Sequence, residues 1–174
     1  MQIFKTAYDI WWDDLLPGYS DQPRIIIGHD GVNPVKLYCH DWHSEKDSPW
    51  HQRHIRTAYV DNGYWMLKIE ESGSYSFKLR RWPEETHLAL NGVAPVRPAI
   101  PGTSVSESKK SKALIIQKAT LKIQDFELSK NVDPNAEFVE FTIELKAGEA
   151  ELNTWFHLES GETIGAYFVS VEKH

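Results

Sequence analysis

Residues 139–156 read VEFTIELKAGEAELNTWF, and this stretch decides the fold. In its first half every second residue is apolar, in the row Val139, Phe141, Ile143 and Leu145. Ala147-Gly148 then turns the chain, and the alternation resumes at Leu152 and continues to Phe156. A period of two is typical of a β-strand with one face buried and the other in water. The stretch therefore predicts two half-buried strands.

Short apolar or alternating runs recur on both sides of this stretch. They occupy residues 24–27, 35–39, 65–69, 75–80, 119–123 and 167–171. Together they predict about eight or nine short strands, with Glu71-Ser-Gly73 as a hairpin turn. We predict an all-β fold, a two-sheet antiparallel β-sandwich of jelly-roll or galactose-binding-like type, with a short N-terminal helix.

The beginning of the chain has a different period. Phe4, Tyr8, Trp11 and Leu15 recur at helical spacing, and Pro17-Gly18 ends the run. We expect a helical segment within residues 1–20, packed against a β-sandwich domain formed by residues 21–174. Residues 83–112 contain four prolines and several Ser, Gly and Lys residues. They predict a long exposed connection between the two halves of the sandwich.

The bulk composition excludes several classes of protein. The chain has 174 residues, enough for one domain with a substantial core, and a formal charge of −6. The negative charge and the absence of a long basic tract argue against nucleic acid as a partner. No apolar run is long enough to span a membrane, and the first residues do not predict a signal peptide. Cys39 is the single cysteine, so no disulfide can form within the chain.

Residues 40–65 gather side chains that suit a polar ligand. Four of the eight histidines and three of the seven tryptophans lie there. Five residues are candidate ligand contacts: Trp42, His43, Trp50, His51 and Arg56. The tryptophans could stack on a sugar ring, the histidines could donate to hydroxyl or sulfate oxygens, and the arginine could bind a sulfate through two hydrogen bonds.

A structural interpretation of the same loop stays open. In it the tryptophans plug one end of the sandwich, backbone carbonyls satisfy the histidines, and Arg56 pairs with Asp41 or Asp61. The sheet faces offer a second surface, because Trp82 and Trp155 occupy positions that nominally face solvent. We expect the 83–112 connection or the helix to cover these two tryptophans.

The sequence predicts no catalytic residue, metal or cofactor. The histidine pairs His40/His43 and His51/His54 lack an accompanying CxxC or HExxH motif. No nucleophile elbow and no Gly-rich phosphate loop is present. Cys39 alternates with Val35 and Leu37, which predicts a buried and inert thiol.

Three phrases carry a family resemblance. NPVKLYCHDWH at 33–43, RRWP at 80–83 and LKAGEAELNTW at 145–155 resemble the C-terminal accessory region of bacterial arylsulfatases. The resemblance implies a β-sandwich from a periplasmic or secreted parent. It also implies an N-terminal catalytic domain, with its formylglycine and cation, that this chain lacks. No sulfatase catalytic residue can be transferred, because Cys39 is followed by His40-Asp41 and not by the C/S-x-P-x-R motif.

Three classes of function remain. The first is a non-catalytic accessory domain of the arylsulfatase C-terminal type, which contributes to recognition of sulfated carbohydrate or packs on a sulfatase-type catalytic domain. The second is a free-standing carbohydrate-binding module of galactose-binding type, with a neutral or sulfated glycan as partner. The third is a small β-sandwich hydrolase or lyase that uses the histidine cluster. We favour them in this order.

Overall fold

The computed structural model describes residues 2–18 and 22–174. Its helical elements are α1 (Gln2–Leu15), η1 (Leu16–Gly18), η2 (Cys39–Asp41), α2 (Gln52–Thr57) and η3 (Glu84–Thr86). Its strands are β1 (Ile25–Ile27), β2 (Val35–Tyr38), β3 (Tyr64–Ile69), β4 (Gly73–Arg80), β5 (Ile116–Ile123), β6 (Phe126–Asn131), β7 (Val139–Leu145), β8 (Gly148–Leu158), β9 (Thr163–Ile164) and β10 (Phe168–Lys173).

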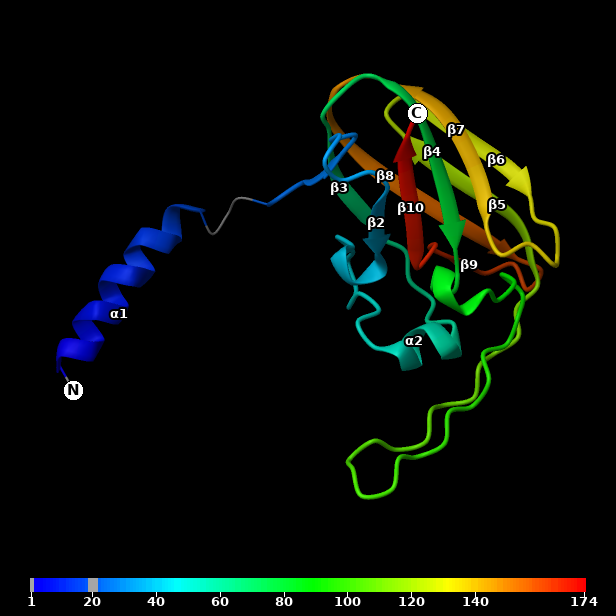
Figure 1. The fold of residues 1–174 in the computed structure, drawn as a ribbon, viewed down its shortest axis with the longest axis horizontal. Helices are drawn as coiled ribbons and strands as arrows, with labels where there is room; N and C mark the ends of the chain where they lie inside the picture. The colour runs from blue at the N-terminus through cyan, green and yellow to red at the C-terminus, as the bar shows by residue number, and fades with distance from the viewer. Residues whose placement is uncertain (1, 19–21) are drawn as a thin grey trace.

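The strands form two sheets that face each other (Figure 1). One sheet has the order β2-β10-β4-β7, and the other has the order β1-β3-β8-β5-β6 with β9 paired to β8. Every pairing between these strands is antiparallel except that of β1 with β3. The predicted two-sheet antiparallel sandwich with a short N-terminal helix is confirmed.

Period-two alternation builds the core between the sheets. Along β7 the residues Val139, Phe141, Ile143 and Leu145 are buried, and those between them are more exposed. β8 continues the pattern, with Leu152, Thr154 and Phe156 buried. Since successive side chains of a strand point to opposite faces, each strand gives one row to the core and one to solvent.

The predicted hairpin at Glu71-Ser-Gly73 is wrong. Ile69, at the end of β3, pairs with Gly148 in one sheet, whereas Gly73, at the start of β4, pairs with Leu145 in the other. The turn therefore carries the chain between sheets. A turn within a hairpin and a turn between two sheets need the same small residues, so the sequence does not distinguish these two kinds of turn.

Two elements had no clear sequence signal. β6 makes a hairpin with β5, yet all its residues are exposed, so it shows no apolar alternation. α2 has only 6 residues, too few for a helical period to show. α2 is therefore an element that the sequence did not predict, and it forms one wall of the site described below.

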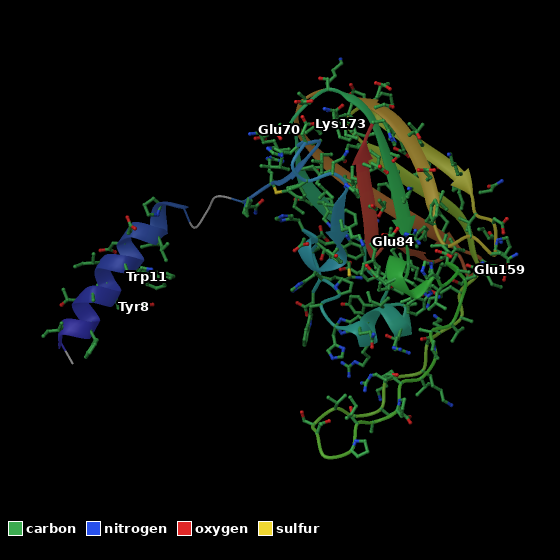
Figure 2. All side chains as sticks on the ribbon, viewed as in Figure 1. Tyr8, Trp11, Glu70, Glu84, Glu159 and Lys173 are labelled. Carbon is green, nitrogen blue, oxygen red and sulfur yellow. The ribbon has the colours of Figure 1, made fainter. Side chains whose placement is uncertain are left out.

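The N-terminal helix stands apart from the sandwich. Its residues from Ile3 to Leu15 are all exposed, including Phe4 at 81% and Trp11 at 54%. Figure 2 shows the labelled Tyr8 and Trp11 well away from both sheets. The expected packing of the helix on the sandwich is therefore wrong. The expected boundary after residue 20 lies outside the described residues, and among those described no helix has the length and apolar character to cross a membrane.

Candidate functional site

A cleft of about 970 Å³ opens at one end of the sandwich. Its walls come from the end of β2 with η2, from α2 and the loop before it, from the segment after β4, and from the start of β10. α2 and the end of β2 lie at the lower end of the sandwich in Figure 1. Segments distant in sequence thus meet here, which is typical of a binding site at the end of a sandwich.

Three aromatic side chains present surface to this cleft. Trp50 is 66% exposed and Tyr38 is 46% exposed. Phe168, at the start of β10, is partly buried and meets the Tyr38 ring edge to face, at 6.0 Å between centroids. The main-chain pairing of Phe168 with Tyr38 fixes this contact. A large exposed tryptophan in a concave site is a surface that a ligand can cover.

α2 orients the polar residues beside Trp50. His51 caps the helix, because its Nδ1 accepts a hydrogen bond from the Arg53 main-chain nitrogen at 3.0 Å. The Trp50 ring meets the His51 ring edge to face at 5.6 Å. The helix ends at Thr57, and the next residue, Ala58, caps it in a left-handed conformation. His51 and Gln52 therefore line the cleft from a defined helix start.

Arg56 has a structural role that neither sequence interpretation anticipated. It is buried and pairs with neither Asp41 nor Asp61. Its Nη1 instead donates to the main-chain oxygens of Ala94, Pro95 and Lys109. Arg56 thus joins the outgoing leg of the 83–112 connection, at residues 94–95, to its returning leg, at residue 109. It also lines the cleft.

Trp42 is a core residue, so its predicted role in stacking on a ligand is corrected. It is 6% exposed and meets Trp65 edge to face at 5.6 Å. A Cβ added at Gly63 or at Gly165 would come within 2.6 Å of the Trp42 side chain. The plug interpretation therefore describes Trp42, whereas Trp50 in the same loop is exposed.

His43 lies outside the walls of the cleft. It forms an isolated main-chain bridge with Tyr64, and the two rings stack at 5.4 Å between centroids. The structure therefore brings together Trp50, His51 and Arg56 of the five candidates and leaves Trp42 and His43 elsewhere.

Arg81 and Trp82 are two buried residues next to the cleft, and Trp82 lines it. Neither was predicted as a site residue. Arg81 is fully buried and donates to the main-chain oxygens of Leu90, Gly92 and Lys112. Burial lowers its pKa to about 10. Trp82 is covered as expected, with its Nε1 donating to the Gly92 oxygen at 3.2 Å. In the sequence, these two residues could have been noticed as an Arg-Trp pair directly after the strand predicted at 75–80.

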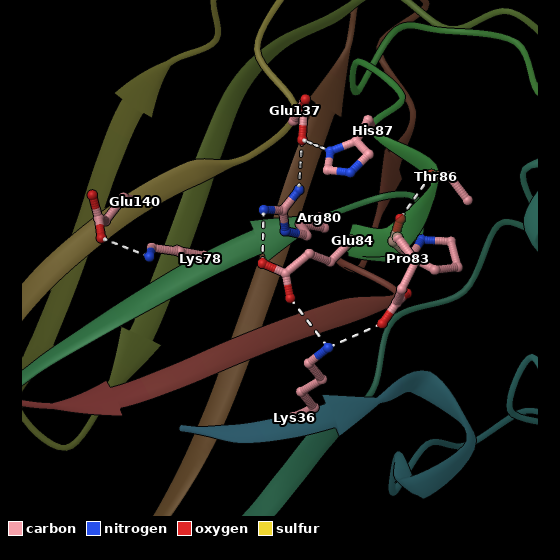
Figure 3. Close-up of polar contacts among 10 residues, drawn as sticks. Lys36, Lys78, Arg80, Pro83, Glu84, Thr86, His87, Glu137 and Glu140 are labelled. Carbon is pink, nitrogen blue, oxygen red and sulfur yellow. Dashed lines mark hydrogen bonds and ion pairs between the residues drawn. The ribbon is translucent and has the colours of Figure 1, made fainter. Parts of the chain in front are cut away.

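The wall formed by η3 is held by ion pairs on the outer face of the four-stranded sheet (Figure 3). Arg80, at the end of β4, bridges Glu84 of η3 at 3.5 Å and Glu137 at 3.3 Å. Lys36 of β2 bridges Glu84 and Glu85 at 3.1 and 3.0 Å. The network ties η3 to three parts of the sandwich, so Pro83 and Thr86 are fixed where they line the cleft.

Burial shifts the pKa values of two titratable groups near the cleft, Cys39 and His54. Cys39 donates its thiol hydrogen to the Pro49 oxygen at 3.2 Å, and burial raises its pKa to about 12. Burial also lowers the pKa of His54, and the positive charge of Arg53 lowers it further. Within residues 2–18 and 22–174, no group of three His, Cys, Asp or Glu side chains could hold a metal ion.

The comparisons with known proteins identify no family for this chain. No family model matches the sequence, and no curated protein matches it either. Among solved structures, the chain is similar to a ruminal GH26 endo-beta-1,4-mannanase, with a TM-score of 0.44 and 13% sequence identity. The similarity covers 81% of this chain and 26% of the mannanase chain.

Proposed function

We propose that this chain is a non-catalytic accessory domain that recognises carbohydrate in the cleft between α2, η3 and the start of β10. One observation carries the proposal: Trp50 is 66% exposed at the mouth of a cleft of about 970 Å³. Exposing such a large apolar ring to water is unfavourable unless a ligand or partner covers it.

The polar groups around the aromatic rings suit a sugar. Gln52, His40 and Asp41 line the same cleft and offer both donors and acceptors. Tyr38 adds a second half-exposed ring beside Phe168. A pyranose has one apolar face and a rim of hydroxyl groups, so flat rings with polar neighbours match its surface. The Cys39 thiol at the cleft is buried and its pKa is raised to about 12, so this thiol is not an activated nucleophile.

The test is a Trp50→Ala variant assayed on an array of neutral and acidic glycans and by calorimetry with the best ligand. Affinity should fall by about tenfold or more, because an anchoring aromatic residue contributes a large share of the binding free energy. The melting temperature should hardly change, since the ring is mostly in solvent. Trp11→Ala is the matched control, because Trp11 is also exposed but lies on α1.

Two outcomes would count against this function. The first is that the wild-type chain binds no glycan at millimolar concentration. The second is that Trp50→Ala and Trp11→Ala bind the same glycan as tightly as the wild type, which would place the sugar outside the cleft.

A second candidate function is docking on a partner protein, and the exposed apolar side chains of α1 favour it. Together with the resemblance in sequence to arylsulfatase C-terminal regions, they support docking on a sulfatase-type catalytic domain. α1 is a single helix of 14 residues, a length that is marginal in water without packing. Mixing the chain with such a catalytic domain, with and without residues 1–18, would test this role by gel filtration. A complex that forms equally well without the helix would exclude α1 as the contact.

A further inference from the structure

A second hollow of about 380 Å³ adjoins the cleft. It lies between α2 and the returning leg of the 83–112 connection, and it shares His51, Gln52 and Arg56 with the cleft. We name it the cationic groove, after the side chains of Arg53, Arg56, Arg97 and Lys109 that line it. A ligand that contacts Trp50 could therefore continue into it past the start of α2.

The charge of the cationic groove opposes that of the whole chain. The protein has a formal charge of −6, yet three arginines and a lysine line this hollow, and Glu107 is the acidic residue among the lining. None of the four forms an ion pair with a carboxylate in the part of the chain that the structure describes. Elsewhere, by contrast, Arg80 and Lys36 each bridge two carboxylates.

Two of the guanidinium groups are already held in place. Arg56 Nη1 is fixed by carbonyl oxygens, and Arg97 donates to the oxygens of Pro98 and Ser106 at 3.1 and 3.0 Å. These contacts are to neutral acceptors, so they orient the cations without neutralising them. A guanidinium has five N–H donors, which leaves donors for a ligand. Preorganised cations lose little side-chain entropy when an anion binds.

We propose that the cationic groove is an acid subsite, and that the ligand is an anionic saccharide. Its ring would cover Trp50 and its sulfate or carboxylate group would enter the groove. The proposal rests on carbohydrate recognition by the cleft and adds the class of sugar. A fork of N–H donors matches the paired oxygens of either acid group.

The test compares three oligosaccharides of equal length by calorimetry: a neutral galactan, its O-sulfated form and an oligogalacturonate. At least one acidic ligand should bind about tenfold more tightly than the neutral one, with an affinity that falls as salt is added. The stronger of the two acidic ligands identifies the acid group.

The variant is Arg53→Gln with Lys109→Gln, because both side chains are exposed and outside the core. It should lose the preference for acid while keeping the affinity for the neutral sugar. Lys68→Gln with Lys146→Gln is the matched control, which removes the same charge from exposed positions outside the groove. The control should keep the wild-type preference.

The failures of the two proposals can be told apart. Equal binding of neutral and acidic ligands, unchanged in the groove variant, overturns the acid subsite and leaves carbohydrate recognition standing. An acid preference lost equally in the control variant also overturns it, because the effect would then follow net charge. The absence of binding by all three ligands overturns both proposals.

Discussion

Trp42 and Trp50 belong to one loop, and their surroundings give them opposite roles. Trp42 packs against Trp65 and Tyr167, with the main chain of two glycines close to its ring. The Trp50 ring stands perpendicular to the rings of His51 and His54 and leaves most of its surface in water. The first side chain therefore stabilises the fold, and the second is available to a ligand.

Trp42→Ala should lower the free energy of unfolding by ~3–5 kcal/mol, because it leaves a cavity that the rigid neighbours cannot fill. Trp50→Ala should change it by less than about 0.5 kcal/mol, since surface substitutions seldom do more. Urea unfolding followed by circular dichroism measures both values. Similar losses for the two variants would contradict this division of roles.

The burial of Cys39 should make the free energy of unfolding depend on pH in the alkaline range. Burial raises the pKa of its thiol from 9.0 to about 12, so the unfolded chain releases this proton at lower pH than the folded one. The contribution of Cys39 is therefore fully present below pH 9 and is lost as pH rises towards 12. Cys39→Ala should flatten this part of the pH profile of the melting temperature. An identical alkaline decline in the variant would show that other groups cause it.

At the scale of the elements, the 83–112 connection has a fixed base and an exposed tip. Arg56 and Arg81 hold the base through main-chain carbonyls on both legs. Further out, Arg97 and Ser108 exchange two hydrogen bonds, at 2.8 and 2.9 Å. The segment beyond them, residues 98–107, is exposed throughout. In Figure 1 the two legs run together away from the sandwich.

Replacing residues 98–107 with a short Asn-Gly turn should shift the melting temperature by no more than about 2 °C, because the segment buries little surface. Arg56→Ala should cost ~1–3 kcal/mol, since three main-chain carbonyls, one of them in a buried contact, would lose their donor. Differential scanning calorimetry compares the two variants. A larger loss for the shortened loop than for Arg56→Ala would mean that the tip contributes to the stability of the base.

The strands were predictable from the sequence, and their connections were not. Alternation along β7 and β8 reports which face of each strand is buried, and this depends on local sequence alone. The turn at Glu71–Gly73 joins two sheets, and that depends on which distant strand pairs with Ile69. β6 carries no apolar alternation because neither of its faces is buried. Local patterns therefore predicted the sandwich and missed its edge.

From the sequence, the loop that contributes to the cleft was easier to predict than the individual residues that line it. The density of His, Trp and Arg in residues 40–65 indicated a loop of which part lines the cleft. It could not separate Trp42 from Trp50, since their difference arises from Gly63, Gly165 and Tyr167, which pack on only one of them. Phe168, Trp82 and Pro83 reach the cleft through strand pairing across the whole molecule, so no local motif could place them there.

The direction of β10 determines how the protein can be attached to a surface. Phe168, at the start of this strand, lines the cleft, whereas Lys173, at its far end, pairs with Tyr75. With ~3.3 Å of rise per residue, the strand places Lys173 about 17 Å from Phe168. In Figure 1 the C-terminus and α2 lie at opposite ends of the sandwich. Immobilisation through a C-terminal tag on a sensor chip would therefore leave the cleft facing the flowing analyte.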